Sequence, residues 1–194
     1  MIIGLTGGSG TGKSSACAFF EKKGFLILDL DKVSRKVCRK GEKCLDEIAE
    51  YFGTDILDQN GELIRRKLGD IVFSDRKKLE MLNKITHKYL IEETEKFISE
   101  NKDKNIVLDA AVLFESGADS LCTHTLCVLS SVENRLRRIT ERDNISEESA
   151  KNRISSQPDD GFYISRCDAA VHNDSDIDGL YRQLEECFGG DYVG

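Results

Sequence analysis

Proline is nearly absent from this sequence, with one among 194 residues, and long apolar runs are missing altogether. One proline and 16 glycines exclude collagen-like and proline-rich proteins. The apolar run 110–114, which no other run exceeds, is far shorter than the roughly 18 residues that a membrane helix needs. The N-terminus shows neither a basic region before an apolar one nor a small-residue cleavage site. We therefore expect no membrane span, no membrane partner and no secretory signal.

An excess of positive charge is missing as well. The chain has 28 Lys and Arg against 35 Asp and Glu, which gives a net charge of −7. This balance argues against bulk electrostatic binding to nucleic acid or to anionic membranes, and we expect no nucleic-acid partner. It still allows a local basic pocket for a phosphorylated ligand.

Regularly spaced cysteine pairs are also lacking. The seven cysteines are an odd number and form no C-x-x-C pair, so we expect reduced thiols and a cytoplasmic location. Cys122, His124 and Cys127 lie close together in the sequence. A fourth ligand with regular spacing is missing and the segment is typical of a strand, so we do not expect a metal there.

Five short apolar runs predict the secondary structure that is present. They are nearly continuous, as is typical of parallel strands buried on both faces, and cover 2–6, 25–28, 106–109, 125–129 and 169–171. Helical periodicity separates them, which predicts an α/β doubly wound sheet with right-handed crossovers. The stretch 31–104 is too long for a simple crossover, so we expect a helical subdomain there.

The most specific motif is a phosphate loop. Gly7–Ser14 reads GGSGTGKS, which matches G-x-x-x-x-G-K-[ST] between a predicted strand and a predicted helix. Glycines let consecutive N–H groups turn inward around phosphates. Lys13 should reach the β- and γ-phosphates and the Ser14 hydroxyl should coordinate Mg²⁺. A glycine-rich turn with a chance Lys-Ser pair is the alternative, but the motif and its flanks favour binding of a nucleoside triphosphate.

Motifs of a GTPase are incomplete. The segment 101–104 reads NKDK and fails N-K-x-D at its fourth position, and a D-x-x-G at 176–179 comes near the C-terminus, in the wrong order. We therefore expect no switch GTPase. At 194 residues, a large mechanical ATPase is not expected either.

Two carboxylates follow the second predicted strand, in Asp29-Leu30-Asp31. The carboxyl ends of parallel strands form the ligand crevice of an open sheet, so we expect both carboxylates beside the phosphate loop. One could accept a proton from an attacking hydroxyl, and the other could hold Mg²⁺ through water or orient the acceptor. The alternative for Asp31 is an N-cap of a helix over 32–38.

A basic helix face follows the fourth predicted strand. Arg135, Arg138 and Arg142 fall within about 60° of one another on a helix. In an acidic chain this convergence favours a surface that meets phosphate. In small kinases this region is the lid that closes over the transferred group. A solvated face with Glu–Arg pairs is the alternative.

Taken in order, these segments resemble the dephospho-coenzyme A kinases over nearly the whole chain. The matching positions are 3–8, 29–31, 52–53, 61–63, Arg65, 72–75, 113–117, Arg138, Arg142, Asp143, Gln157, Arg166, Asp168, Asn173 and Asp174. The chain departs from the family pattern at Lys88 and at 111–113, where proline is usual. We expect the loss of both prolines to affect the acceptor pocket.

The resemblance implies transfer of the γ-phosphoryl group of ATP to the ribose 3′-hydroxyl of dephospho-CoA, with Mg²⁺ as cofactor. It implies a P-loop kinase fold similar to nucleoside monophosphate kinases: a five-stranded parallel sheet flanked by helices, a helical acceptor-binding subdomain and a lid. Within a single domain, 1–194, the expected core is 1–30, 105–134 and 167–194, the acceptor-binding subdomain 31–104 and the lid 135–166.

The same resemblance implies roles for individual residues. Asp31 is the expected base, Asp29 its neighbour at the acceptor, and Arg142 the lid arginine with Arg138 in support. The residues expected around the ATP phosphates are Gly10, Thr11, Gly12, Lys13, Ser14 and Ser15, of which Lys13 is also catalytic and Ser14 binds the metal. Those expected near the acceptor are Thr6, Arg65, His87, Leu113, Phe114 and Glu115.

Alternatives remain open at this point. Arg65 could be an exposed helix arginine, and His87 a helix histidine satisfied by its neighbours. The chain could be another small P-loop kinase acting on a nucleotide or nucleoside, or a non-catalytic module whose bound ATP controls docking. The acidic pair argues against the module, since a sensor needs no acceptor base. The expected partners are ATP and dephospho-CoA, with the chain a monomer or weak homo-oligomer.

Overall fold

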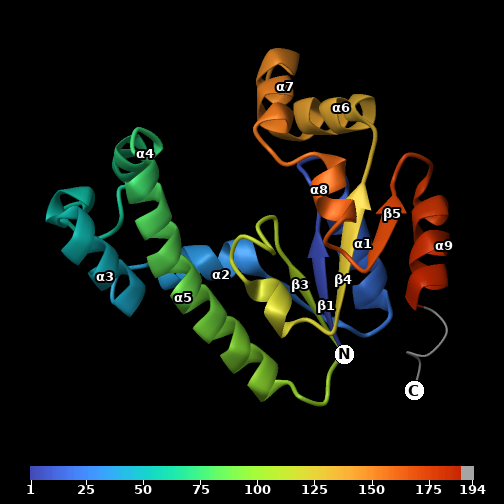
Figure 1. Ribbon diagram of the computed structural model, residues 1–194, viewed down its shortest axis with the longest axis horizontal. Coiled ribbons are helices and arrows are strands. Elements are labelled where there is room, and N and C mark those ends of the chain that lie inside the picture. Colours follow the sequence, from blue (N-terminus) through green and yellow to red (C-terminus); the bar gives the residue numbers. More distant parts are fainter. Residues whose placement is uncertain (189–194) are drawn as a thin grey trace. The chain divides into compact units, whose positions relative to one another are not determined.

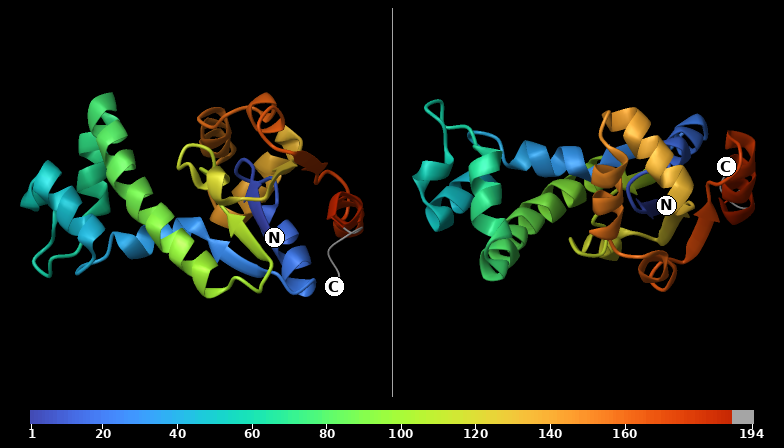
Figure 2. Two further views of the ribbon diagram at one scale, coloured as in Figure 1. Left: turned by 60° about the horizontal axis from the view of Figure 1, so that its bottom comes forward. Right: turned by 90° about the horizontal axis from the view of Figure 1, so that it is seen from above.

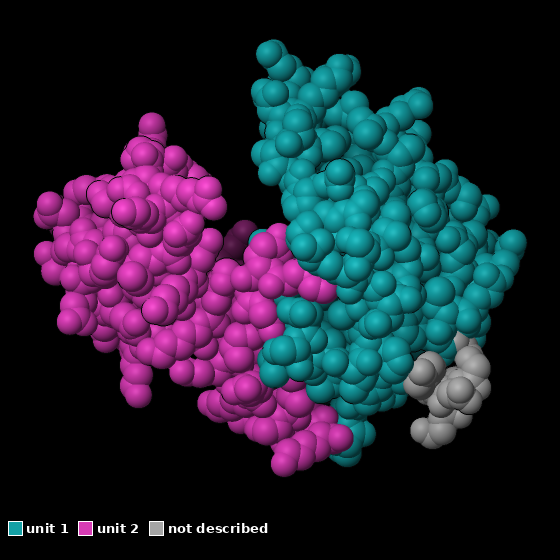
Figure 3. Space-filling view, in the orientation of Figure 1, with its two compact units in different colours: residues 1–28, 103–113, 118–194 teal, residues 29–102, 114–117 magenta. Residues whose placement is uncertain are grey.

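The computed structural model describes residues 1–188, which form two compact units (Figure 3). Unit 1 holds 1–28, 103–113 and the described residues from 118 onward, and unit 2 holds 29–102 and 114–117. The last residues of the expected core, 189–194, lie outside the described part of the chain. No helix within 1–188 combines the length and apolar character needed to cross a membrane.

Unit 1 is built on a five-stranded sheet with the order β2-β3-β1-β4-β5 (Figure 1). The strands are β1 (Ile2–Thr6), β2 (Leu26–Asp29), β3 (Ile106–Asp109), β4 (His124–Leu129) and β5 (Ala169–His172). β1 pairs in parallel with β3 and β4, and β4 in parallel with β5. All five predicted strands are confirmed to within one residue at each end, because short continuous apolar runs mark strands covered on both faces.

Helices and short 3-10 turns connect these strands. In unit 1 they are α1 (Lys13–Lys22), η2 (Ala118–Leu121), α6 (Val132–Asp143), α7 (Glu147–Ser155), α8 (Asp160–Ile164) and α9 (Ile177–Phe188). Helices α6 to α8 lead from β4 to β5 (Figure 1, Figure 2). The core joins Leu5 and Val128 of the sheet to Phe20 of α1 and Leu184 of α9, and all four are buried. These contacts hold α1, the helix that follows the phosphate loop, against β1.

The strand order determines where a ligand can bind. Because β1 lies between β3 and β4, the loops that follow these three parallel strands start at the same edge of the sheet. Leu5 is opposite Asp109, and Thr6 is opposite Cys127. The carboxyl edge of an open α/β sheet is where ligands bind.

Unit 2 is helical and has its own core. Its elements are α2 (Leu30–Val37), α3 (Lys43–Phe52), η1 (Thr54–Ile56), α4 (Arg65–Phe73) and α5 (Arg76–Glu100). The core is formed by the buried residues Val37, Cys38, Cys44, Ile48, Ile56, Leu68, Val72 and Ile85. Helix α5 starts where Asp75 accepts hydrogen bonds from the N–H groups of Lys77 and Lys78.

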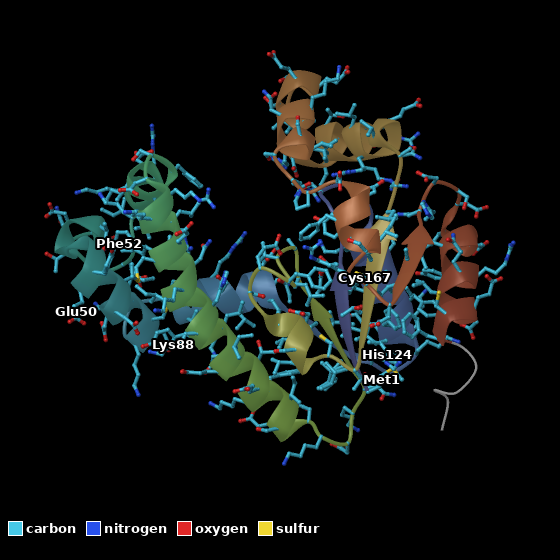
Figure 4. All side chains as sticks on the ribbon, viewed as in Figure 1. Met1, Glu50, Phe52, Lys88, His124 and Cys167 are labelled. Carbon is cyan, nitrogen blue, oxygen red and sulfur yellow. The ribbon has the colours of Figure 1, made fainter. Side chains whose placement is uncertain are left out.

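We expect Ile48→Ala to lower the free energy of unfolding by about 2–5 kcal/mol, because Ile48 is fully buried in the core of unit 2 and truncation leaves a cavity. Glu50→Ala is the control. Glu50 is exposed on the same helix (Figure 4), so its truncation should change stability by about 0.5 kcal/mol or less. Urea unfolding followed by circular dichroism measures both, and equal losses would contradict the core assignment.

Candidate active site

The phosphate loop runs from β1 into α1 in unit 1. Gly10 and Gly12 have φ angles of +78° and +96°, which residues with a side chain rarely adopt. A Cβ atom on Gly12 would lie 2.0 Å from Nδ2 of Asn173, so only glycine fits. Inside the loop, the Thr11 hydroxyl donates to the carbonyl oxygen of Gly8 at 2.9 Å. The predicted strand-loop-helix context of the motif is therefore confirmed.

The N-terminus of α1 is suited to an anion. Gly12 is its N-cap, no side chain of the described residues caps it, and its first turn holds no acidic residue. The first N–H groups of a helix have no acceptor within the helix and lie at the positive end of its dipole. A phosphate placed there would accept hydrogen bonds from these N–H groups.

Lys13, the first residue of α1, lies next to a carboxylate of β3. Its Nζ atom is 3.8 Å from Oδ1 of Asp109, the last residue of that strand. The exposed Ser14 follows it on α1. Both Ser14 and Asp109 offer oxygen ligands, which Mg²⁺ prefers, and Mg²⁺ usually takes its remaining ligands from phosphate and water. The donor set therefore fits Mg²⁺.

Asp109 is a site residue that the sequence analysis did not select. Its side chain is 24% exposed, and its neighbour across the sheet is Leu5 of β1. A single aspartate at the carboxyl end of a predicted buried strand was the signal that could have found it, by the same reasoning that selected Asp29 and Asp31.

Two of the three predicted arginines bind the phosphate loop. Arg138 donates from Nη1 to the carbonyl oxygens of Gly10 and Thr11, each at 3.3 Å. Arg135 is only 4% exposed and donates from Nε to the carbonyl oxygen of Ser9 at 3.0 Å. Both arginines therefore fix the loop itself. A contact of Arg138 with substrate stays a prediction.

Arg142 lies on the same helix but has different partners. Its Nε and Nη2 atoms donate to the Asp143 carboxylate at 2.7 and 2.9 Å, and Arg153 of α7 binds the same carboxylate. The hydrogen bond to Asp143 raises the pKa of Arg142, and the bonds from Arg142 and Arg153 lower the pKa of Asp143. The Arg142 side chain is 63% exposed, so its role as the lid arginine stays a prediction.

Asn173 follows β5 and also contacts the loop. It is 6% exposed, and its Nδ2 atom donates to the carbonyl oxygen of Thr11 at 2.8 Å. Its own carbonyl oxygen accepts from Nη2 of Arg138 at 2.8 Å and from the Ser130 hydroxyl at 3.0 Å. No role beyond a family match was predicted for Asn173.

The two residues of the acidic pair have different surroundings in unit 2. Asp29 is the N-cap of α2, where its Oδ1 accepts from the N–H of Lys32 at 2.9 Å and its Oδ2 lies 3.1 Å from Nζ of Lys32. Partial burial alone would raise the pKa of Asp29, but the hydrogen bonds from Lys32 outweigh it and the pKa is lowered.

Asp31 is the second residue of α2 and its side chain is exposed. The alternative in which Asp31 caps the helix is therefore wrong. The helix begins at Leu30, two residues before the predicted start, so the cap position falls on Asp29. The Asp31 carboxylate therefore lies in the first turn of the helix, where it interacts favourably with the helix dipole but does not cap the helix.

The residues predicted near the acceptor are distributed over both units. In unit 1, Thr6 and Leu113 are fully buried, and the Thr6 hydroxyl has no hydrogen-bond partner among the described residues. In unit 2, burial lowers the pKa of His87, and the charge and backbone of the neighbouring Glu115 oppose this shift. The structure thus brings His87 and Glu115 together.

The two remaining acceptor candidates also belong to unit 2. Phe114 directly precedes Glu115. Arg65 is the exposed first residue of α4, and its Nη2 donates to the carbonyl oxygen of Arg35 at 3.4 Å. An exposed guanidinium with one weak backbone contact is compatible with either role considered for Arg65.

The family model of dephospho-CoA kinase matches residues 1–179. The chain belongs to the dephospho-CoA kinase family. The dephospho-CoA kinase of Fusobacterium nucleatum is 40% identical over 185 residues, which cover 95% of each chain. That of Listeria innocua is 38% identical over 186 residues, which cover 94% of this chain and 92% of the other.

Solved structures support the fold of the family. A crystal structure from Thermus thermophilus has a TM-score of 0.82 at 28% identity, covering 97% of this chain and 96% of the other. The dephospho-CoA kinase from Campylobacter jejuni has a TM-score of 0.70 at 22% identity, covering 98% and 96%. A shikimate kinase from Bacteroides thetaiotaomicron reaches 0.56 at 15% identity, covering 97% and 98%. The predicted P-loop kinase fold is confirmed.

We expect Lys13→Ala to abolish phosphoryl transfer while the fold stays intact, because the loop lysine meets charge on the phosphates and contributes little to a core. Lys22→Ala is the matched control, at the other end of α1, and should keep full activity. A coupled assay of ADP release measures both variants. A purified Lys13→Ala protein with more than about a tenth of normal turnover would contradict the phosphate-loop assignment.

Proposed function

We propose that this chain transfers the γ-phosphoryl group of ATP to the ribose 3′-hydroxyl of dephospho-CoA, which gives coenzyme A and ADP in the last step of CoA biosynthesis. The observation that carries the proposal is a phosphate loop with a free helix N-terminus, in a chain whose residues 1–179 match the dephospho-CoA kinase family. Membership of this family makes the chain an ATP-dependent kinase.

The ATP phosphates bind at the loop and at the start of α1. The N–H groups of residues 10–15 and the positive end of the helix dipole hold the phosphate oxygens. Lys13 moves its ammonium group from Asp109 toward the β- and γ-phosphates. The loop N–H groups, the helix dipole and the lysine thus compensate the charge on the transferring group, in place of mobile water.

Ser14 and Asp109 would hold Mg²⁺ directly or through water. Bound Mg²⁺ supplies charge neutralisation at the β- and γ-phosphate oxygens. Ser14 is exposed at the loop and Asp109 lies at the adjoining strand end beside Lys13, which supports this assignment.

Asp31 accepts the proton of the 3′-hydroxyl on a carboxylate oxygen. Its carboxylate is exposed and takes no part in capping α2, which supports a role as base. The transition state of phosphoryl transfer is loose, so the proton moves late and activation of the nucleophile contributes modestly. Asp29 keeps α2 in place and stands beside Asp31 in the chain.

The remaining predicted groups complete the proposal. Arg142 stabilises the equatorial oxygens of the transferring group from the lid, 135–166, and Arg138 supports the loop. The segment 31–104 binds the acceptor, which is supported by the separate core of unit 2. The acceptor-side residues stay as predicted: Thr6, Asp29, Arg65, His87, Leu113, Phe114 and Glu115.

We also propose that the protein works in the cytoplasm as a monomer or weak homo-oligomer. All seven cysteines are free thiols, two of them with Sγ atoms 3.8 Å apart, which suits a reducing compartment.

The substrate is tested by comparing acceptors. We expect ADP release with dephospho-CoA to exceed release with AMP, CMP or adenosine by at least about 10²-fold in kcat/KM, because specificity is set by transition-state binding of the whole acceptor. Preference for another nucleotide would show a related small kinase. Binding of Mg-ATP without turnover of any acceptor would show a non-catalytic module.

We expect Asp31→Asn to lower kcat on the order of 10²-fold, at the lower end of what loss of a general base costs. Asparagine keeps the size but cannot take the proton. Stability should hardly change, because Asp31 is exposed and is not the cap. Steady-state kinetics and melting temperature measure both effects.

Asp29→Asn is the comparison for Asp31→Asn. Asparagine still caps a helix, so α2 should persist and the variant should act mainly on the KM of dephospho-CoA. A normal kcat in Asp31→Asn together with an inactive Asp29→Asn would exchange the two roles. Activity in both would show that the pair is structural.

We expect Arg142→Ala to lower kcat by roughly 10²–10⁴, by extension from the effect of arginine fingers, with little change in the dissociation constant of dephospho-CoA. Arg137→Ala is the control on the same helix, where the exposed guanidinium only reaches Oδ1 of Asn134 at 3.2 Å. An unchanged kcat with weaker acceptor binding in Arg142→Ala would place Arg142 in the acceptor site.

A further inference from the structure

Every polar group of Ser9 in the phosphate loop is bound by a side chain from the segment after β4. Its N–H donates to Oε1 of Gln157 at 2.8 Å, and its hydroxyl accepts from Nε2 of the same glutamine at 3.1 Å. Its carbonyl oxygen accepts from Nε of Arg135 at 3.0 Å. One residue of the loop is thus held on three sides.

The two side chains that hold Ser9 also hold each other. Oε1 of Gln157 accepts a further hydrogen bond from Nη2 of Arg135 at 3.2 Å. Nη1 of Arg135 lies 3.9 Å from Oδ1 of Asp160, at the start of α8. Ser9, Gln157 and Arg135 form a closed network, in which the buried arginine has defined partners. We call these three residues the Ser9 clamp.

The Ser9 clamp holds the loop at the residue just before the phosphate-binding N–H groups. The N–H groups expected to bind phosphate begin at residue 10, so bonding the N–H of Ser9 to Gln157 removes none of them. The clamp also presses closely on the backbone, since a Cβ atom on Gly8 would lie 2.5 Å from Nη2 of Arg135. The path of the backbone into Gly10 is therefore determined by side chains of α6 and of the α7–α8 connection.

We propose that Gln157 is a positioning residue for phosphoryl transfer, which aligns the phosphate-binding N–H groups by holding Ser9. The inference rests on the proposed function for its kinetic readout. Catalysis of phosphoryl transfer depends on positioning, and a displacement of about 1 Å can cost on the order of 10² in rate. Gln157 touches no reacting atom and acts through Ser9.

The decisive variant is Gln157→Leu, which keeps the approximate size and removes both polar atoms. We expect kcat/KM for ATP to fall by about 10- to 100-fold, with the KM for dephospho-CoA changed by less than about two-fold. Gln157→Glu is the conservative variant. Its two oxygens can accept from the Ser9 N–H, from Arg135 and from the Ser9 hydroxyl, which can donate instead of accept. We expect it to stay within about three-fold of the normal value.

Gln183→Leu is the matched control in the same unit. Gln183 also binds a backbone through both polar atoms, accepting from the N–H of His172 and donating to its carbonyl oxygen, each at 2.8 Å. These contacts lie between α9 and β5, and neither of them is to a residue of the phosphate loop. Gln183→Leu should therefore lower the melting temperature at least as much as Gln157→Leu, and leave the kinetic constants unchanged.

Hydrogen exchange of the Ser9 amide, followed by NMR, tests the Ser9 clamp without any turnover. We expect exchange to be faster in Gln157→Leu than in the normal protein and in Gln183→Leu. If Gln157→Leu does not fold, the same measurements are made on Gln157→Asn. Its side chain is one methylene shorter and cannot reach Ser9 and Arg135 at once.

The possible outcomes separate the two proposals. Normal kinetics in Gln157→Leu, when the unmodified protein is active on dephospho-CoA, would overturn the positioning role. Equal losses in Gln157→Glu and Gln157→Leu would also overturn it, since the acceptor atoms would then not matter. If the unmodified protein does not phosphorylate dephospho-CoA, the proposed function fails. The Ser9 clamp is then tested by the exchange of the Ser9 amide and by the affinity for ATP.

Discussion

The site depends on one constraint of the backbone: a loop that turns its N–H groups toward an anion turns carbonyl oxygens the other way. Where those oxygens are shielded from water, they need hydrogen bonds from the protein. Here the carbonyl oxygens of Ser9, Gly10 and Thr11 accept from Arg135, from Arg138, and from Arg138 with Asn173. The phosphate-binding side of the loop is stable because its reverse side is satisfied.

This requirement explains why basic residues gather around the loop of a chain with a net charge of −7. Arg135 and Arg138 supply charge-assisted hydrogen bonds to the loop and add positive potential where a triphosphate binds. Arg142, one turn further along α6, is neutralised by Asp143 and shares it with Arg153. One helix face thus serves the loop at its first two arginines and presents the third to solvent.

The two aspartates at the start of unit 2 have different surroundings. Asp29 satisfies the N-terminus of α2 and is engaged by Lys32, whereas Asp31 is exposed two residues later. The buried core around Ile48 packs the helices of this unit together, and side chains such as Arg65 lie exposed outside that core.

The sequence by itself determined the five strands, the phosphate loop and the family, because each is written in adjacent residues: continuous apolar runs for strands, and glycines with Lys13 and Ser14 for the loop. It did not determine which aspartate caps α2, because the start of a helix depends on how its first turn packs. Nor did it identify Asp109 beside Lys13, or Gln157 on Ser9, 148 residues away along the chain. Only the tertiary structure decided these contacts, since a hydrogen bond acts over about 3 Å and no local pattern records which distant side chain folds to that distance.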